Sequence, residues 1–300
     1  MHRFLRAAGF SRLSELDDEE RLIQDICAHS DSRRTVKLEN GYLFGEFSRR
    51  FGKNIGVTVC GILDKNNHFH VQYYFPYGRG DSSLEMDSVA VDRHMRTLSF
   101  AAACDDMRIG TTIIFYVANA ADYLLAGSPK TLEGTSVIQL CGMADSGAVL
   151  LPVSSDQRPL SEDPGKLEYR SNLFKAAQNG DEEAIESLTM EDYDLYTSIT
   201  RRVRNEDVYT IVDSYFIPYG MECDLYNVMG EIKQVTSSRN VVTDENIIRL
   251  QIVTNDIPID VCINEKDLMG EPLPGRRFKG VIWLQGQIMM PGGDVPHQGS

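Results

Sequence analysis

Positive charge, long apolar runs and catalytic sequence motifs are all scarce in this chain. Its 300 residues contain 30 lysines and arginines against 44 aspartates and glutamates, which gives a net charge of −14. A chain this acidic repels a polyanion at long range, so broad binding to nucleic acid is disfavoured. We therefore expect an unknown protein or small molecule as the partner, with a homo-oligomer as an alternative.

Long apolar segments are also missing. The first residues, MHRFLRAAGFSRL, contain neither an apolar run of signal-peptide length nor a small-residue cleavage site. The most apolar long segment, residues 111–127, is interrupted by Asn119 and Asp122 and is too short to span a bilayer. These absences predict a soluble cytoplasmic protein without a membrane partner.

The common catalytic and cofactor motifs are absent as well. The sequence lacks GxxxxGK[ST], GxGxxG after a strand, GxSxG, HExxH and an EF-hand loop. The usual nucleotide-hydrolase, Rossmann, α/β-hydrolase and zincin mechanisms are therefore disfavoured, and we expect no cofactor. The six cysteines form no CxxC pair, and four of them lie in apolar stretches, so we expect core packing and neither disulfides nor metal ligation.

The N-terminal part contains signals for one helix and a β-hairpin. Ser14 and Asp17 resemble a capping box, and an apolar stripe follows them, which predicts a helix over residues 14–27. The stretches NIGVTVCGIL and HFHVQYYF are rich in β-branched and aromatic residues and are separated by DKNN. A hairpin with that loop pairs Leu63 with His68 and Cys60 with Val71. Its predicted core face consists of Cys60, Ile62, Phe69, Val71, Tyr73 and Phe75.

Further strands are predicted at 95–103, 109–118, 136–141 and 148–153, with a short helix at 120–125. Runs of strands with few crossover helices predict an α+β fold with a mostly antiparallel sheet and flanking helices. The stretch SSDQRPLSEDPGK has the composition of a linker. We predict an N-terminal α+β domain over residues 1–155 and a linker over 156–168.

The remainder, residues 169–290, is predicted to form a second domain. Short helices at its start are followed by several strands with glycines between them. This pattern favours a strongly bent antiparallel sheet or an OB-like partial barrel. The last ten residues, 291–300, are typical of a disordered tail.

A short motif occurs twice. YYFPYG ends at Gly78 and SYFIPYG ends at Gly220, and each follows a predicted strand. Duplication of an ancestral segment is one explanation. Two coincident strand exits are the favoured one, because proline and glycine often end strands.

The stretch GEPLPGRRFKGVIWLQG at residues 270–286 suggests a binding surface. Alternation along the strand places Trp283 on a mostly polar face beside Lys279 and Gln285, where an aromatic ring can hold bases or sugars. Arg276 and Arg277 could clamp an anion. The alternative is structural: the glycines serve strand bending, Trp283 covers a second small core or a domain interface, and the arginines pair with acidic residues. That alternative explains the glycines better.

A second polar group suggests chemistry. His68 and His70 are two apart on a strand and share a face, as two metal ligands would, but the sequence shows no third ligand beyond the candidates Asp64 and Asp105. Asp105 and Asp106 are adjacent at the end of a strand and could do acid–base work if a partner converged on them. Surface histidines and a charged turn are the simpler interpretation, so no metal is expected.

Several stretches together resemble a family of proteins. They are MHRFLRAAGFS, FPYG, NGDEEAIESLTMEDYDLY, YFIPYGMECDLYNVMGEI and DVCINEKDLMGEPLPGRRFKGVIWLQG. The chain is similar over its whole length to the uncharacterised bacterial domain-of-unknown-function family numbered 3881. The resemblance implies a soluble bacterial protein whose activity is unassigned, and it supplies no site residues.

Three hypotheses follow from the sequence. The first is a non-enzymatic ligand- or protein-binding module that uses the C-terminal sheet around Trp283. The second is an enzyme of unrecognised class with an interdomain site formed by His68, His70, Asp105 and Asp106. The third is a structural homo-oligomer subunit.

Overall fold

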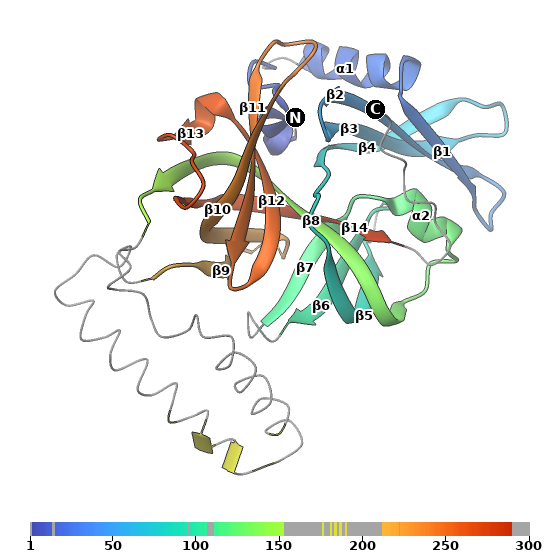
Figure 1. Ribbon diagram of the computed structural model, residues 1–300. Helices are drawn as coiled ribbons and strands as arrows, with labels where there is room; N and C mark the ends of the chain where they lie inside the picture. Colours follow the sequence, from blue (N-terminus) through green and yellow to red (C-terminus); the bar gives the residue numbers. More distant parts are fainter. Residues whose placement is uncertain are drawn as a thin grey trace. The chain divides into compact units, whose positions relative to one another are not determined.

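The computed structural model describes residues 2–13, 16–94, 97–106, 111–152, 212–221 and 223–289, with isolated positions between 176 and 190 (Figure 1). The chain divides into two units, one formed by Met1–Leu150 with Ser214–Ser300 and the other by Leu151–Asp213. In the second unit the Asp181 carboxylate accepts a hydrogen bond from the Ala184 amide at 3.1 Å, which is a helix N-cap contact. The predicted linker at 156–168 and the tail at 291–300 lie outside the described residues.

The first unit begins with a short 3-10 helix and a longer α-helix. The 3-10 helix η1 (Arg3–Ala8) ends at Gly9, which has a φ of 84°. Helix α1 (Leu16–Ala28) buries Leu22 and Ile26, as the predicted stripe requires. Figure 1 shows α1 lying over β2 and β3 of the first sheet. Among the described residues, no helix combines the length and the apolar character needed to cross a membrane.

The first sheet is an antiparallel meander of four strands. They are β1 (Ser32–Lys37), β2 (Leu43–Gly52), β3 (Ile55–Leu63) and β4 (Phe69–Gly78). The predicted hairpin is present as β3 and β4, but its register differs, because Leu63 pairs with Phe69 and Cys60 pairs with Tyr73. The loop has five residues, because β3 ends at Leu63 and β4 begins at Phe69, and the Asp64 amide donates to the His68 carbonyl across it.

A β-bulge explains why the pairing of Cys60 is shifted by one residue more than that of Leu63. The register shifts between Cys60 and Gly61, and an extra residue in one strand interrupts the alternation of faces. Val71, which we expected in the core, is 43% exposed. The other predicted core residues of the hairpin are buried or half-buried.

The second sheet contains the remaining described strands and mixes both pairing directions. Its first strands are β5 (Leu84–Arg93), β6 (Phe100–Asp106), β7 (Thr111–Val117) and β8 (Thr131–Leu150), with helix α2 (Ala120–Leu125) before β8. Its later strands are β9 (Tyr215–Pro218), β10 (Leu225–Arg239), β11 (Asn246–Thr254), β12 (Ile257–Asn264), β13 (Leu268–Met269) and β14 (Arg277–Met289), with 3-10 helix η4 (Glu265–Asp267) after β12. The α+β class is consistent with these elements, but β7 pairs in parallel with β14, and β12 and β13 pair in parallel with β8.

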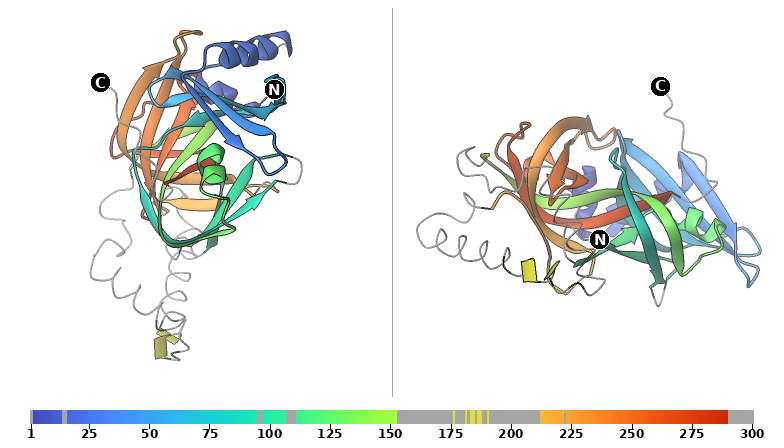
Figure 2. Two further views of the ribbon diagram at one scale, coloured as in Figure 1. Left: turned by 90° about the vertical axis from the view of Figure 1, so that its right-hand side faces the viewer. Right: turned by 60° about the horizontal axis from the view of Figure 1, so that its bottom comes forward.

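Strands from both predicted domains belong to this one sheet. Strand β8 pairs with β14 from Val137 opposite Met289 to Leu150 opposite Arg277, and Figure 2 shows the two strands side by side. The predicted boundary after residue 155 therefore does not separate the strands into two domains. The sequence interpretation divided β8 into two short strands at the polar stretch MADSG, whereas the strand runs through it for 20 residues.

Within the described residues, the strand pairings close two rings that share β8 and β14. One ring follows β8, β12, β11, β10 and β14, and the other follows β8, β5, β6, β7 and β14. The expected single OB-like partial barrel is thus not what the C-terminal strands form. They close only by including β8 from the N-terminal half.

The two rings have the same connectivity. A three-strand meander leads to a helix and then to a long central strand in each case. The first series is β5, β6, β7, α2 and β8, and the second is β10, β11, β12, η4 and β14, with the two-residue strand β13 between η4 and β14. The parallel pair Tyr116 and Gln285 in one ring corresponds to Asp260 and Cys141 in the other. In this register SVIQLCG at 136–142 aligns with GVIWLQG at 280–286.

Matched glycines show why this repeat is structural. A Cβ on Gly142 would lie 2.7 Å from Ile282 Cδ1, and a Cβ on Gly286 would lie 2.3 Å from Phe115 Cδ2. The central strands therefore need glycine at equivalent positions for close packing. The YYFPYG and SYFIPYG motifs end just before β5 and β10, so the fold favours duplication over coincident strand exits.

Candidate functional site

Trp283 lies in the core, which contradicts its expected position on an open face. The side chain is 7% exposed, and its ring centroid is 5.8 Å from that of Phe4 and 5.1 Å from that of Tyr116. Its indole Nε1 donates a hydrogen bond to Asp224 Oδ2 at 2.7 Å. Because β14 is central in the sheet and η1 packs against this region, strand alternation does not separate core from solvent here.

The neighbours predicted to form a binding surface with Trp283 are also partly buried. Gln285 is 1% exposed and donates to the Pro76 carbonyl at 2.6 Å, while Arg277 is 6% exposed. Arg276 donates to the carbonyl of Glu271 at 2.7 Å and pairs with its carboxylate at 3.5 Å, as the structural alternative expected. Lys279 is half-buried. No open aromatic platform exists among these five described residues.

The structure places His68 and His70 together at the β3–β4 loop of the first sheet, whereas Asp105 belongs to the second sheet. Both imidazoles contact the Asp64 carboxylate, at 3.4 Å and 3.2 Å. Asp64 Oδ1 also accepts the backbone amides of Asn66 and His68. The pKa of Asp64 is lowered to about 2, mainly by the hydrogen bond from the His68 backbone amide and also by the His70 side chain. These contacts cap the hairpin loop of the first sheet.

Asp105 and Asp106 lie at the end of β6 in the second sheet. Asp105 accepts a hydrogen bond from the Thr112 hydroxyl at 2.6 Å, and Asp106 is 7% exposed. Within the described part of the chain, no group of three or more histidine, cysteine, aspartate or glutamate side chains is arranged to hold a metal ion. The aspartates thus lie on the second sheet, whereas His70 lies on β4 of the first sheet and His68 in the loop before it.

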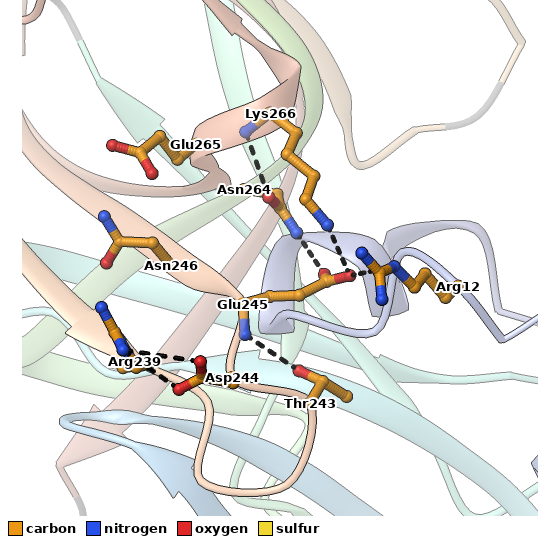
Figure 3. A pocket seen from close by; sticks show the side chains of 9 residues that line it. All are labelled: Arg12, Arg239, Thr243, Asp244, Glu245, Asn246, Asn264, Glu265 and Lys266. Atoms are coloured by element: carbon orange, nitrogen blue, oxygen red, sulfur yellow. Dashed lines mark hydrogen bonds and ion pairs between the residues drawn. The ribbon is translucent and has the colours of Figure 1, made fainter.

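A polar pocket lies elsewhere, where the N-terminal segment meets the turn between β10 and β11. Its volume is about 460 Å³. The lining side chains come from the N-terminal segment, from the β10–β11 turn and from the end of β12 with η4 (Figure 3). They are Arg12, Arg239, Thr243, Asp244, Glu245, Asn246, Asn264, Glu265 and Lys266.

Glu245 organises one wall of the pocket. Its side chain is 3% exposed, and Oε1 accepts hydrogen bonds from Ser11 Oγ at 2.6 Å and Lys266 Nζ at 2.9 Å. Oε2 accepts the Ser11 amide at 3.1 Å and Asn264 Nδ2 at 2.6 Å. Burial alone would raise the pKa of Glu245, but these bonds outweigh it and the pKa is lowered. The carboxylate is therefore a satisfied anion that holds the pocket together.

The β10–β11 turn fixes the N-terminal segment beside the pocket. Asn240, which is fully buried, donates to the Ala8 carbonyl at 2.8 Å, and the Thr243 hydroxyl donates to the Gly9 carbonyl at 2.6 Å. Gly9 has a positive φ, and a Cβ there would lie 2.8 Å from Asn240 Cβ. Glycine therefore allows the close approach that brings Arg12 to the pocket.

Some polar side chains that line the pocket take little or no part in the contacts that hold it together. Among the described residues, the Asn246 amide and the Glu265 carboxylate have no hydrogen-bond or ion-pair partner. The Arg12 side chain is 84% exposed, and its Nε lies 3.9 Å from Glu245 Oε1. Arg239 pairs with Asp244 at 3.2 Å. Glu245 and Asn264 thus form the hydrogen-bonded frame that holds the pocket walls together. Arg12, Asn246 and Glu265 take little or no part in this frame and remain available to contact a ligand.

Sequence interpretation missed this pocket. The polar stretches TDEN and NEKD at its edges directly adjoin the apolar strands β11 and β12, and that abrupt change in polarity was the available signal. Their meeting depends on pairing between these strands and on the docked N-terminal segment, which no local pattern encodes.

The fold and this site define an α+β protein with two sheets in its described part and a polar pocket between segments distant in sequence. The family profile described as "Domain of unknown function, E. rectale Gene description (DUF3881)" matches residues 5–286. The chain belongs to this family, which confirms the resemblance inferred from its sequence. No curated protein and no solved structure matches the chain.

Proposed function

We propose that this protein is a non-enzymatic binding module that takes a small polar molecule in the pocket beside the β10–β11 turn. The observation that carries the proposal is a preformed pocket whose lining includes polar groups that have no partner within the described part of the chain. Its volume of about 460 Å³ lies in the range of small-molecule sites. This moves the expected ligand site from Trp283 to another part of the C-terminal strands.

Preorganisation supports the proposal. Glu245 and Asn264 are buried and hydrogen-bonded, so the backbone that presents Arg12, Asn246 and Glu265 is held in place before a ligand arrives. Ligand binding then loses little conformational entropy in ordering the site. The lining is polar and charged, which favours a ligand that forms hydrogen bonds over an apolar one.

Arg12 is the best residue for a test. Its guanidinium offers five donors and contributes little to the frame, because its contact with Glu245 is 3.9 Å long. Removing a charge-assisted hydrogen bond to a ligand is worth about tenfold in affinity. We therefore expect Arg12→Ala to weaken ligand binding about tenfold while leaving folding intact.

Arg21→Ala provides a matched control. Arg21 is 77% exposed and has a carboxylate partner, Asp18, at the same 3.9 Å, but it lies on α1 outside the pocket. The experiment screens amino acids, short carboxylates, sugars and nucleotides by thermal shift and measures hits by isothermal titration calorimetry. A ligand whose affinity falls equally in both variants, or in neither, would contradict the pocket as the binding site.

A further inference from the structure

We infer that the ligand of this pocket is a small zwitterion of the α-amino-acid class, an inference that rests on the proposed binding function. The pocket presents charges of both signs on different sides. Figure 3 shows Arg12 and the Lys266 ammonium on one side of the Glu245 carboxylate, and Glu265 with Asn246 on the other side. A molecule with an anionic and a cationic group matches this arrangement.

The positive side suits a carboxylate. Arg12 and Lys266 carry two positive charges against the one negative charge of Glu245, so the local sum is +1. The Glu245 oxygens already accept from Ser11, Lys266 and Asn264, which leaves them no free lone pair for a ligand cation. Arg12 has unused donors in a planar fork, the geometry that binds carboxylates with two hydrogen bonds.

The negative side suits an ammonium group. Arg239 and Asp244 neutralise each other at 3.2 Å, so Glu265 supplies the uncompensated charge there. Its carboxylate and the Asn246 amide oxygen are acceptors without a partner among the described residues. An ammonium group has three donors and can use both acceptors.

Three ligands of similar shape test the inference: L-alanine, propionate and ethylammonium. Calorimetric titration of the full-length protein should give the tightest binding for L-alanine, by about tenfold over each singly charged analogue. Glu265→Gln should remove the preference for L-alanine over propionate. Arg12→Gln should remove the preference for L-alanine over ethylammonium, and Arg21→Gln should leave both preferences unchanged.

Failure of the inference differs from failure of the proposed function. Equal affinities for L-alanine and propionate, or an unchanged preference in Glu265→Gln, would overturn the zwitterion assignment. If a sugar or dicarboxylate binds instead and depends on Arg12, the pocket binds ligands but the zwitterion assignment is wrong. If no compound binds in an Arg12-dependent way, both are wrong.

Discussion

The carboxylate of Glu46 should make the stability of this protein depend on pH. Glu46 lies on β2, is 7% exposed, and accepts a hydrogen bond from the Ala121 amide at 3.0 Å. Burial raises its pKa from 4.5 to about 6, although the Ala121 bond and the charges of Arg34 and Arg79 oppose the rise. Each pKa unit corresponds to about 1.4 kcal/mol, so ionised Glu46 destabilises the folded state by about 2 kcal/mol.

The sign follows from the raised pKa. The folded state holds the Glu46 proton more tightly than the unfolded chain, so this contribution to stability is complete below pH 4.5 and is lost as pH rises through about 6. Glu46→Gln carries no titrating group at this position. Relative to wild type, the variant should therefore gain about 2 kcal/mol of unfolding free energy between pH 4 and pH 7.5.

Urea unfolding of both proteins across this range measures that difference, and subtracting the two curves removes the contribution of other titrating groups. Glu20→Gln, which changes an exposed glutamate of α1, serves as the control. A wild-type minus Glu46→Gln difference that stays constant from pH 4 to pH 7.5 would refute the reasoning.

Three further predictions concern the core and the frame of the pocket. Emission of Trp283, the single tryptophan, should be blue-shifted and protected from acrylamide, because the ring is 7% exposed; red-shifted, readily quenched emission would contradict its packing. Gly142→Ala and Gly286→Ala should each destabilise the protein by about 1–3 kcal/mol in chemical denaturation, because a Cβ at either site meets side-chain atoms of Ile282 or Phe115; unchanged midpoints would contradict the close packing. Glu245→Ala should cost about 3 kcal/mol and speed amide exchange in residues 2–13, since it removes the acceptor for Ser11 and Asn264; unchanged exchange would show that Glu245 does not anchor this segment.

Local features of the fold could be predicted from the sequence, because short-range patterns determine them. The apolar stripe of α1 and the β3–β4 hairpin depend on neighbouring residues. The PYG ending after β9 reaches a turn at Gly220, whereas Pro76–Gly78 continue strand β4. The register of the hairpin was missed because a loop residue and a bulge each shift the pairing by one.

Features that depend on distant segments could not be predicted in this way. The alternation of side chains along β14 did not predict the burial of Trp283, because strands on both sides and the N-terminal segment cover this residue. The predicted boundary after residue 155 does not match the strand pairing, because β8 pairs with strands from both halves of the chain. The repeat of VIxLxG at 137–142 and 281–286 was visible in the sequence, however, and comparing those two stretches would have predicted the equivalent central strands.

The pocket could not be predicted from the sequence for a similar reason. The side chains proposed to contact a ligand, Arg12, Asn246 and Glu265, come from three separate segments. Each is an ordinary polar residue in its own stretch, and only the folded chain brings them around one cavity.

The most direct measurement of ligand binding in this pocket is a map of amide chemical-shift changes by two-dimensional NMR during titration with L-alanine or the strongest hit of the screen. We predict that the largest changes fall in residues 11–12, 243–246 and 264–266, while the indole signal of Trp283 stays in place. Changes centred on Trp283, or spread without a maximum at these three segments, would contradict the proposed site.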